Sequence, residues 1–322
     1  MKKIIVSVLC IALLFTIFAL VACNNKTADV EYAKYVVMTP DGAPSMALAK
    51  MMKDQTVFND SVGEYSLIAA DQIKTAFVNG EADFIIAPTN AGVQLSAKTG
   101  NYYLAAVTSW GNLYIVGKGI KSREECSSAS EFLAQFQGKT IGSIGQGAVP
   151  DVTFSHLLAQ YDVEVTVDPS DAPTIQTKLN EGSLDLAILG EPAVTATLSN
   201  VSGVKRLASV SSLWKEVVGQ EFPQASLFVK KSVDTKTVEA FLTAVSSSID
   251  YLNASSENAK ELGDYMESRK DSTLKGAVVS KCYLAMSQKF VKASEVKSDV
   301  LEFVNVLGVN VTAEKLNEIV LK

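Results

Sequence analysis

Short apolar runs alternate with segments of helical periodicity along the first third of the chain. Residues 35–38 form an apolar run that ends at Thr39-Pro40-Asp41-Gly42, and residues 43–53 are predicted to form a helix with a proline in its first turn. Further strands are predicted at residues 65–69, 84–87, 104–108 and 113–116, and further helices at residues 72–79 and 90–98. Strands that alternate with helices at these lengths predict a mainly parallel α/β sheet.

A polar stretch at residues 118–130 interrupts this pattern, and a second series of the same kind follows. Its predicted strands are residues 140–144, 163–167 and 186–189, and its predicted helices are residues 149–161, 174–181 and 192–198. The break predicts a domain crossing near residue 117 and a second α/β unit. Beyond Asp234 the periodicity is almost wholly helical, over residues 238–252, 259–266, 274–286, 296–307 and 313–321, and we expect this helical region to pack back on the first unit.

The two series share an order of elements. Residues 74–93 and 176–195 align at a constant offset, and each contains a helix, Gly-x-x-Asp, an apolar strand, a turn with proline and a new helix. Gly42-Ala43-Pro44 and Gly147-Ala148-Val149-Pro150 likewise precede helices in the two series. The pattern predicts two similarly built lobes with helix N-termini at the carboxyl ends of strands, where open α/β sheets bind ligands.

The N-terminus predicts export and a lipid anchor. Lys2 and Lys3 precede an apolar run over residues 4–22, which is also long enough for a retained transmembrane anchor. Leu20-Val21-Ala22-Cys23 resembles a bacterial lipobox, in which the signal is cut before a cysteine that carries diacylglycerol. The sequence therefore predicts a signal peptide at residues 1–22, lipidation of Cys23 and a polar tether at residues 23–30. An uncleaved anchor with an incidental cysteine is the alternative.

Composition and charge exclude several classes of protein. The 322 residues are 48% hydrophobic and 20% charged, which is typical of a globular chain with an ample core. With 29 basic against 35 acidic side chains and no basic block, nucleic acid is not an expected partner. Without residues 1–22 the balance becomes 27 basic against 35 acidic side chains.

The sequence offers no convincing catalytic or metal-binding motif. His156 lies inside a predicted helix, where a structural role is more common than general base catalysis. The single histidine, with Cys126 and Cys282, cannot form a zinc cluster of usual spacing, although the two cysteines could pair in an oxidising compartment or remain buried thiols. Gly138-Lys139-Thr140 lacks the earlier glycine of a phosphate-binding loop, because Leu133 stands there. No metal, cofactor or enzymatic activity is expected.

Several short motifs together resemble a transport family. They are the lipobox, Asp41-Gly42-Ala43-Pro44-Ser45, Gly80-Glu81-Ala82-Asp83 before Ala87-Pro88-Thr89-Asn90, Trp110-Gly111, and Gly182-Ser183-Leu184-Asp185 before Gly190-Glu191-Pro192. In this combination the chain resembles the periplasmic binding proteins of nitrate, sulfonate, taurine and thiamine-pyrimidine-precursor importers. The resemblance implies an α/β fold of two lobes, the type II periplasmic-binding-protein fold, closing by a hinge around a solute.

The resemblance also implies lobe limits and partners. Lobe 1 is expected at residues 31–116 and 228–322, with the helical C-terminal region on it, and lobe 2 at residues 117–227, with crossings near residues 117 and 227. A membrane-anchored lipoprotein facing the periplasm or the cell exterior is expected to pass its solute to the permease and ATPase of an ABC importer.

Candidate cleft residues follow from the same motifs, and all lie at predicted strand ends. They are Gly42, Ala43, Pro44, Ser45, Thr89, Asn90, Trp110, Gln146, Gly147, Ala148 and Glu191. Each also has a structural interpretation: Ser45 as a helix cap, Trp110 as core and Glu191 as an acid in the first turn of a helix.

The composition of these loops bears on the solute. None of the three arginines, Arg123, Arg206 and Arg269, lies in a candidate loop, and Asp41 and Glu191 would repel an anion. A neutral heteroaromatic solute, such as a pyrimidine or a vitamin precursor, is therefore expected: Trp110 would stack on it, Asn90 and Gln146 would read its polar edges, and Glu191 would accept from an amino group.

Three alternatives stay open. Sulfonate or nitrate binding by the same fold would rest on helix N-termini and neutral donors. A chorismate-dehydratase-like enzyme resembles the same fold but works in the cytoplasm, which the predicted signal opposes. A surface adhesin would need an exposed aromatic face, whereas the aromatic residues are scattered along this chain.

Overall fold

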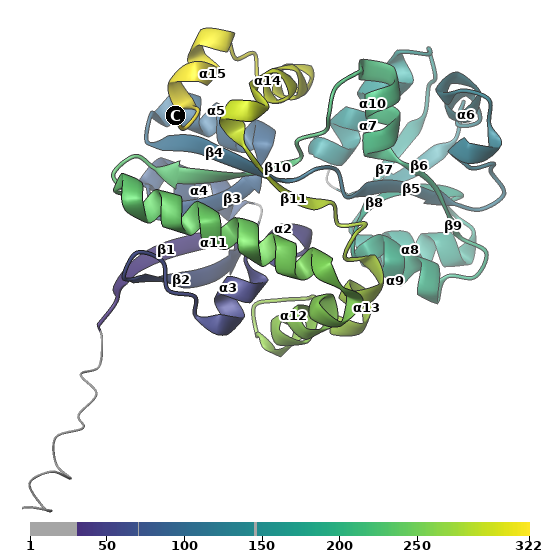
Figure 1. The fold of residues 1–322 in the computed structure, drawn as a ribbon. Helices are drawn as coiled ribbons and strands as arrows, with labels where there is room; N and C mark the ends of the chain where they lie inside the picture. The colour runs from purple at the N-terminus through teal and green to yellow at the C-terminus, as the bar shows by residue number, and fades with distance from the viewer. Residues whose placement is uncertain (1–30, 70, 145–146) are drawn as a thin grey trace, which may run out of the picture. The chain divides into compact units, whose positions relative to one another are not determined.

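A computed structural model describes residues 31–69, 71–144 and 147–322, and residues 34–322 form one compact unit built on two β-sheets (Figure 1). The first sheet has the strand order β11-β4-β10-β3-β1-β2. Its strands are β1 (Ala33–Pro40), β2 (Ser61–Ile68), β3 (Phe84–Pro88), β4 (Tyr102–Ser109), β10 (Ala225–Lys230) and β11 (Gln288–Lys292). The second sheet has the order β7-β6-β8-β5-β9. Its strands are β5 (Leu113–Gly117), β6 (Thr140–Ser143), β7 (Thr166–Pro169), β8 (Leu186–Gly190) and β9 (Lys205–Ser209).

Most strands of each sheet run in one direction, as the alternation of strands and helices predicts. In the second sheet β7, β6 and β8 pair in parallel, and β9 runs the same way because β5 lies antiparallel between β8 and β9. In the first sheet β1 pairs in parallel with β3, whereas β10 lies antiparallel between β3 and β4, and β11 pairs antiparallel with β4. A chain crossing thus supplies a reversed strand to each sheet, β10 or β5, and β11 is a second reversed strand in the first sheet.

Helices cover both sheets. Those of the N-terminal half are α2 (Ala43–Met46), α3 (Ala49–Asp54), α4 (Gln72–Asn79), α5 (Thr89–Thr99), α6 (Ala129–Ala134), α7 (Val149–Ala159), α8 (Ala172–Glu181) and α9 (Ala193–Asn200), with a 3-10 turn η1 (Arg123–Glu125). Those of the C-terminal half are α10 (Val210–Val218), α11 (Thr235–Ala254), α12 (Ser256–Ser268), α13 (Gly276–Cys282), α14 (Lys297–Val306) and α15 (Ala313–Ile319), with a 3-10 turn η2 (Ala293–Glu295). None of the described helices is both long and apolar enough to span a bilayer.

The C-terminal helices pack mainly on the first sheet and its helices. The long helix α11 lies across this sheet and contacts β11 and α3, while α14 and α15 pack on α5 (Figure 1). Phe241 of α11 stacks on Phe84 of β3 with ring centres 3.7 Å apart. Helix α13 also contacts α9 of the second sheet, so the helical region contacts both lobes.

The structure differs from the predicted elements at identifiable places. Residues 43–53 form two helices, because Ala47 and Leu48 donate to carbonyls only three residues back, at 3.3 and 3.0 Å, and so tighten the chain between α2 and α3. The helix predicted at residues 274–286 is limited to α13, and strand β11 lies in a region that the sequence predicts to be almost wholly helical. Strand β9 and helix α10 were not predicted from the sequence.

The sheet changes earlier than the predicted crossing near residue 117. Leu113 pairs with Gly190 and Gly117 with Leu186, so the whole of β5 belongs to the second sheet, and the first crossing is residues 110–112. The return crossing ends at Ala225, which pairs with Pro88 of β3 and with Ser109 of β4. Apolar strands of the two sheets look alike in sequence, so only long-range pairing shows which sheet a strand joins.

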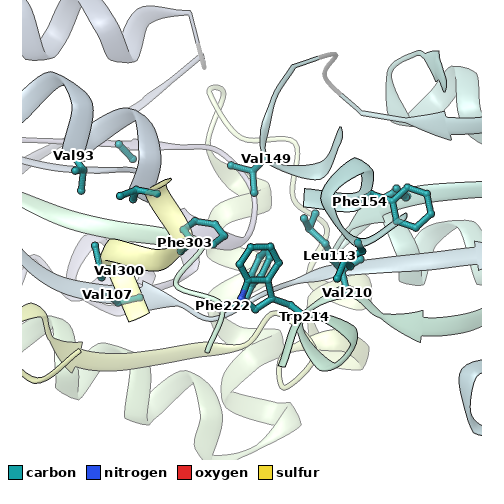
Figure 2. Close-up of a cluster of buried hydrophobic side chains, with 14 of the residues drawn as sticks. Val93, Val107, Leu113, Val149, Phe154, Val210, Trp214, Phe222, Val300 and Phe303 are labelled. Atoms are coloured by element: carbon teal, nitrogen blue, oxygen red, sulfur yellow. The ribbon is translucent and has the colours of Figure 1, made fainter. Parts of the chain in front are cut away.

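One buried cluster packs the two lobes together. Trp214 of α10 and Phe222 of the return crossing lie with ring centres 5.5 Å apart, and Phe303 of α14 lies 4.9 Å from Phe222 (Figure 2). All three side chains are fully buried. Because α14 packs on the first sheet's helix α5 while α10 packs on β5 and β9, this aromatic cluster connects both lobes at the return crossing.

Candidate functional site

The predicted site residues that the structure describes lie at the carboxyl ends of parallel strands. Gly42–Ser45 follow β1, Thr89 and Asn90 begin α5 after β3, and Trp110 follows β4. In the second lobe Gly147 and Ala148 lie between β6 and α7, and Glu191 follows β8. Gln146 and Cys23 lie outside the described residues. This edge of the sheets is where open α/β folds bind ligands.

The loop after β1 is a turn held by hydrogen bonds. Gly42 has φ of 100°, a conformation that favours glycine, and its carbonyl accepts a 2.8 Å hydrogen bond from Ser45 Oγ. Ala43 and Ser45 are buried. Asp41 accepts from Ser272 Oγ at 2.9 Å and from the backbone N–H and hydroxyl of Thr273 at 2.7 and 2.6 Å. Its carboxylate therefore fixes the loop to the connection before α13.

Thr89 and Asn90 take different roles at the end of β3. Thr89 is fully buried, its hydroxyl hydrogen-bonds Ser226 Oγ at 2.7 Å, and its N–H donates to the Gln224 carbonyl at 3.0 Å. Asn90 is half-buried, and its Oδ1 is a buried acceptor without a hydrogen-bond partner. Thr89 thus holds the strand end to the return crossing, while the Asn90 amide remains for another group.

Trp110 is held by the segment that leads into β11. Its N–H donates to Ser287 O at 2.9 Å, and its indole Nε1 donates to Lys289 O at 3.0 Å. The Lys289 ammonium lies 5.7 Å from the ring centre. The ring is half-buried, and its indole N–H is already engaged and is not free to bind a ligand.

Glu191 is not a free acceptor, contrary to the prediction from the sequence. Its side chain is fully buried and forms an ion pair with Arg206 of β9, whose guanidinium also lies over the Tyr114 ring at 4.2 Å. Thr195 donates to the carboxylate from its N–H and from its hydroxyl, both at 3.0 Å. Burial raises the pKa of the Glu191 carboxyl above its usual value, although the Thr195 hydrogen bonds and the Arg206 charge oppose this.

The pairing with Arg206 changes the charge of the site. None of the arginines lies in a candidate loop, but Arg206 reaches Glu191 from a strand and neutralises it. Asp41 is likewise engaged by three donors. Arg206 therefore offsets the charge of Glu191, whereas the donors to Asp41 are neutral and leave its negative charge in place.

Gln224 and Asn112, which no sequence motif indicated, connect the lobes at both crossings. Gln224 accepts from Thr89 N at its carbonyl, and its Oε1 accepts from Asn112 N at 2.9 Å. Asn112 O accepts from Glu191 N at 2.9 Å, and Asn112 Nδ2 donates to Glu191 O at 3.3 Å. A chain of hydrogen bonds thus runs from Thr89 to Glu191. The only sequence signal was the position of Asn112, two residues after Trp110.

Two polar groups at strand ends of the second lobe also lack partners. Asn112 is 7% exposed, and its Oδ1 is buried without a donor. Ser143, the last residue of β6, is 1% exposed, and its Oγ likewise has no partner. Unsatisfied buried polar groups are uncommon in native proteins, and others lie elsewhere in the described chain, such as Trp214 Nε1 and Ser248 Oγ.

Three helices of the site begin without a side-chain cap. Gly42, Pro88 and Ala148 hold the N-cap positions of α2, α5 and α7, and none of them has a side chain that accepts a hydrogen bond from its helix. Asp151 partly compensates at α7 by accepting from Gly147 N at 2.8 Å. At α9 the N-cap residue is Pro192, and the carboxylate of the preceding Glu191 accepts from Thr195 N at 3.0 Å. Uncapped N–H groups at α5 and α7 suit a hydrogen-bond acceptor on a ligand.

A cavity of about 560 Å³ is bordered by Ser155, Asp162 and Val167 beside α7 and β7, away from the predicted residues. No group of three or more potential metal ligands occurs in the described part of the chain. Cys126 and Cys282 are both buried and free, so the pairing that the sequence left open is not formed.

Solved structures of similar fold include binding proteins of ABC transporters. An ABC transporter protein from Parabacteroides distasonis superposes with a TM-score of 0.71 and 18% identity, over 89% of this chain and 95% of that one. The periplasmic aliphatic sulphonate-binding protein of Escherichia coli gives a TM-score of 0.69 and 14% identity, over 91% and 93% of the two chains. This is a periplasmic-binding-protein fold.

The periplasmic nitrate-binding protein of Synechocystis shares the periplasmic-binding-protein fold, with a TM-score of 0.62 and 13% identity over 90% of this chain and 85% of that one. No family model matches the sequence, and no curated protein matches it in sequence. The expected two-lobe α/β fold is thus confirmed by structure, at identities where sequence carries little signal.

Proposed function

We propose that this protein is the solute-binding component of an ABC importer. Its periplasmic-binding-protein fold spans nearly the whole chain, and its site residues lie at the carboxyl ends of strands from both lobes. The observation that carries the proposal is the hydrogen-bonded chain Thr89–Gln224–Asn112–Glu191, which connects the two lobes and leaves unpartnered amide oxygens beside it. A binding site at a hinge couples solute capture to lobe movement.

The proposed location follows from the N-terminal sequence. Residues 1–22 act as a signal peptide, and lipidated Cys23 anchors the lobes to the membrane, facing the periplasm or the cell exterior. The permease and ATPase of the importer are the proposed partners. The lobes are proposed at residues 31–109 and 225–322 for lobe 1 and residues 113–219 for lobe 2, a division that follows the strands of the two sheets.

For the solute, we propose a small heteroaromatic compound such as a pyrimidine or a vitamin precursor. The half-buried Trp110 ring offers a flat apolar surface, and the Asn90 amide makes no hydrogen bond from its buried oxygen. Glu191 takes no direct part, because Thr195 and Arg206 already satisfy its carboxylate.

An oxyanion or a sulfonate is the second candidate. Specific observations favour it: Arg206 offsets the charge of Glu191, and α5 and α7 begin without side-chain caps. Helix N-termini of this kind bind anions through backbone N–H groups. The sulphonate- and nitrate-binding proteins of the same fold are consistent with this candidate.

A thermal-shift screen of residues 24–322 tests both candidates. Pyrimidines, vitamins, sulfonates, nitrate and amino acids are added at rising concentration, and a ligand at 100 times its Kd stabilises the native state by about 2.7 kcal/mol. A dose-dependent shift with one class identifies the solute class. The absence of any shift over the panel counts against solute binding.

The enzyme alternative makes a different prediction. A chorismate-dehydratase-like enzyme would convert its substrate, whereas a binding protein returns the solute unchanged. Incubation of the protein with chorismate and with any solute found in the screen, followed by chromatography, distinguishes the two. Product formation that scales with protein concentration would replace the transport proposal.

A further inference from the structure

Strand β7 leaves one edge of the second sheet open. It stands first in the order β7-β6-β8-β5-β9, and within the described residues it pairs only with β6. Thr166 N donates to Lys139 O at 2.9 Å, so the backbone of Thr166 bonds toward β6. Because successive residues of a strand direct their N–H and C=O groups to opposite sides, Val165 and Val167 direct theirs away from the sheet.

The outward groups of this edge have no partner in the described part of the chain. The N–H and C=O groups of Val165 form no hydrogen bond there. Pro169 ends the strand at the next outward position after Val167, where a missing N–H removes no hydrogen bond of the sheet. The open edge is therefore short, and its donors and acceptors are those that an added strand would use.

A groove lies beside this edge: the cavity of about 560 Å³ between α7 and β7. The residues that border it are Ser155, Leu158, Ala159, Asp162, Val163, Glu164, Val165 and Val167. The three valines are half-buried and stand at alternate positions, so their side chains share one face of the strand. A strand added along β7 would place every second side chain over this apolar face.

The groove carries unpaired negative charge. Asp162 and Glu164 are exposed, and neither carboxylate forms an ion pair or a hydrogen bond within the described residues. Asp168, the next acid along the strand, is already paired with Lys178 at 2.6 Å. None of the described residues that border the groove is a lysine or an arginine. Two copies of the chain joined at this edge would bring like charges to one interface, whereas a basic strand would neutralise them.

We propose that the open edge of β7 binds an extended segment of a partner protein, in which apolar residues alternate with lysine or arginine. The segment adds a strand to the second sheet through the backbone of Val165 and Val167. Its apolar side chains fill the groove beside α7, and its basic side chains meet Asp162 and Glu164. This interaction is separate from solute binding, because none of the proposed solute-site residues borders the groove.

Fluorescence anisotropy with a synthetic peptide tests the proposal on residues 24–322. The probe is a fluorescein-labelled heptapeptide, Lys-Val-Lys-Val-Lys-Val-Lys. We expect saturable binding that weakens as the salt concentration rises from about 0.05 to about 0.5 M. A peptide with glutamate in place of lysine tests the charge, and a fully N-methylated probe keeps its side chains and charge but has no backbone N–H. Each of these two peptides should bind about 10-fold or more weakly than the probe.

Variants locate the binding at this edge. Val165→Pro removes the outward N–H and should abolish binding, and Ala159→Arg should do the same by adding bulk and positive charge to the groove. Ala159 is exposed at the last position of α7, so its arginine variant should keep the melting temperature and decides the question if Val165→Pro does not fold. Glu164→Gln should weaken binding about 3-fold, while Glu302→Gln, at an exposed acid of α14, is the control and should leave it unchanged.

The results that would overturn the inference are distinct from those that bear on solute transport. No saturable binding of the probe, equal binding of the glutamate or N-methylated peptide, or full binding by folded Val165→Pro and Ala159→Arg would each do so. Analytical ultracentrifugation tests the other occupant: a dimer that Val165→Pro abolishes would assign the edge to a second copy instead. A solute that shifts the melting temperature of Ala159→Arg as it shifts the parent would show that solute binding stands whichever way the peptide result falls.

Discussion

The ion pair between Glu191 and Arg206 gives a prediction about stability. Replacing Arg206 by Met keeps much of the side-chain volume over Tyr114 but leaves the fully buried Glu191 carboxylate without its cation. Breaking a fully buried pair costs about 3–5 kcal/mol, and an exposed pair contributes about 0–1 kcal/mol. The Arg206 side chain is 35% exposed, and Thr195 keeps its hydrogen bonds to the Glu191 carboxylate in the variant. We therefore expect the free energy of unfolding to fall by about 2 kcal/mol at neutral pH.

The loss should depend on pH in a defined direction. The pKa of the Glu191 carboxyl is raised in the folded protein by burial, so the folded state holds this proton more tightly than the unfolded state does. Such a group stabilises the fold below its unfolded pKa of 4.5, and this contribution is lost as the pH rises through the folded pKa. Arg206 lowers that folded pKa, so the Arg206→Met variant should be closest to the parent in acid and weakest in mild alkali.

Urea unfolding followed by circular dichroism, at about pH 5 and about pH 8, measures the effect as a change in midpoint. The double variant Arg206→Met with Glu191→Gln is the control, because a neutral amide needs no cation, and we expect it to lose most of the pH dependence. A stability loss that is equal at both pH values, or that persists unchanged in the double variant, would refute the electrostatic reasoning.

Three further outcomes are expected. Phe303→Ala should lower the free energy of unfolding by about 3–5 kcal/mol in a urea titration, because it opens a cavity beside Trp214 and Phe222. Leu284→Ala, at a position 63% exposed, is the control and should change the free energy of unfolding by less than about 0.5 kcal/mol. Similar losses in the two variants would contradict the shared core. Gly92→Ala should lower the melting temperature, since its Cβ would come within 2.1 Å of the Phe228 ring, and an unchanged melting temperature would show that this ring yields freely. In a protein of residues 24–322, the thiols of Cys126 and Cys282 should resist a thiol reagent until the protein unfolds. Both thiols are buried, and burial raises the pKa of Cys282 to about 12. Rapid reaction of two thiols in the native protein would argue against this packing.

The elements with strong local signals were predictable from the sequence. Helix α4 was predicted at its observed limits, and β3, β8 and α8 were predicted within two residues, because apolar periodicity and flanking Gly or Pro define them locally. Strand β5 was also predicted as a strand, but its place in the second sheet depends on pairing with residues about seventy positions away. No local pattern carries that information.

The site shows the same division. Sequence motifs brought attention to Thr89, Asn90, Trp110 and Glu191, and the fold places all of them at strand ends. What the sequence could not show is which carboxylates are already engaged. Arg206 lies in strand β9 rather than in a loop, so its contact with Glu191 becomes visible only when β8, β5 and β9 are assembled.

The position of β10 determines the order in which the chain can complete its first lobe. Strands β3 and β4 are not neighbours, because β10 lies between them and pairs with both. The chain emerges N-terminus first, from a ribosome or through a membrane. The two parts of the first sheet, on either side of β10, therefore cannot join until residues 225–230 have emerged. The second lobe is complete in sequence by then, so it is free to fold first and to bring β10 back to the waiting strands.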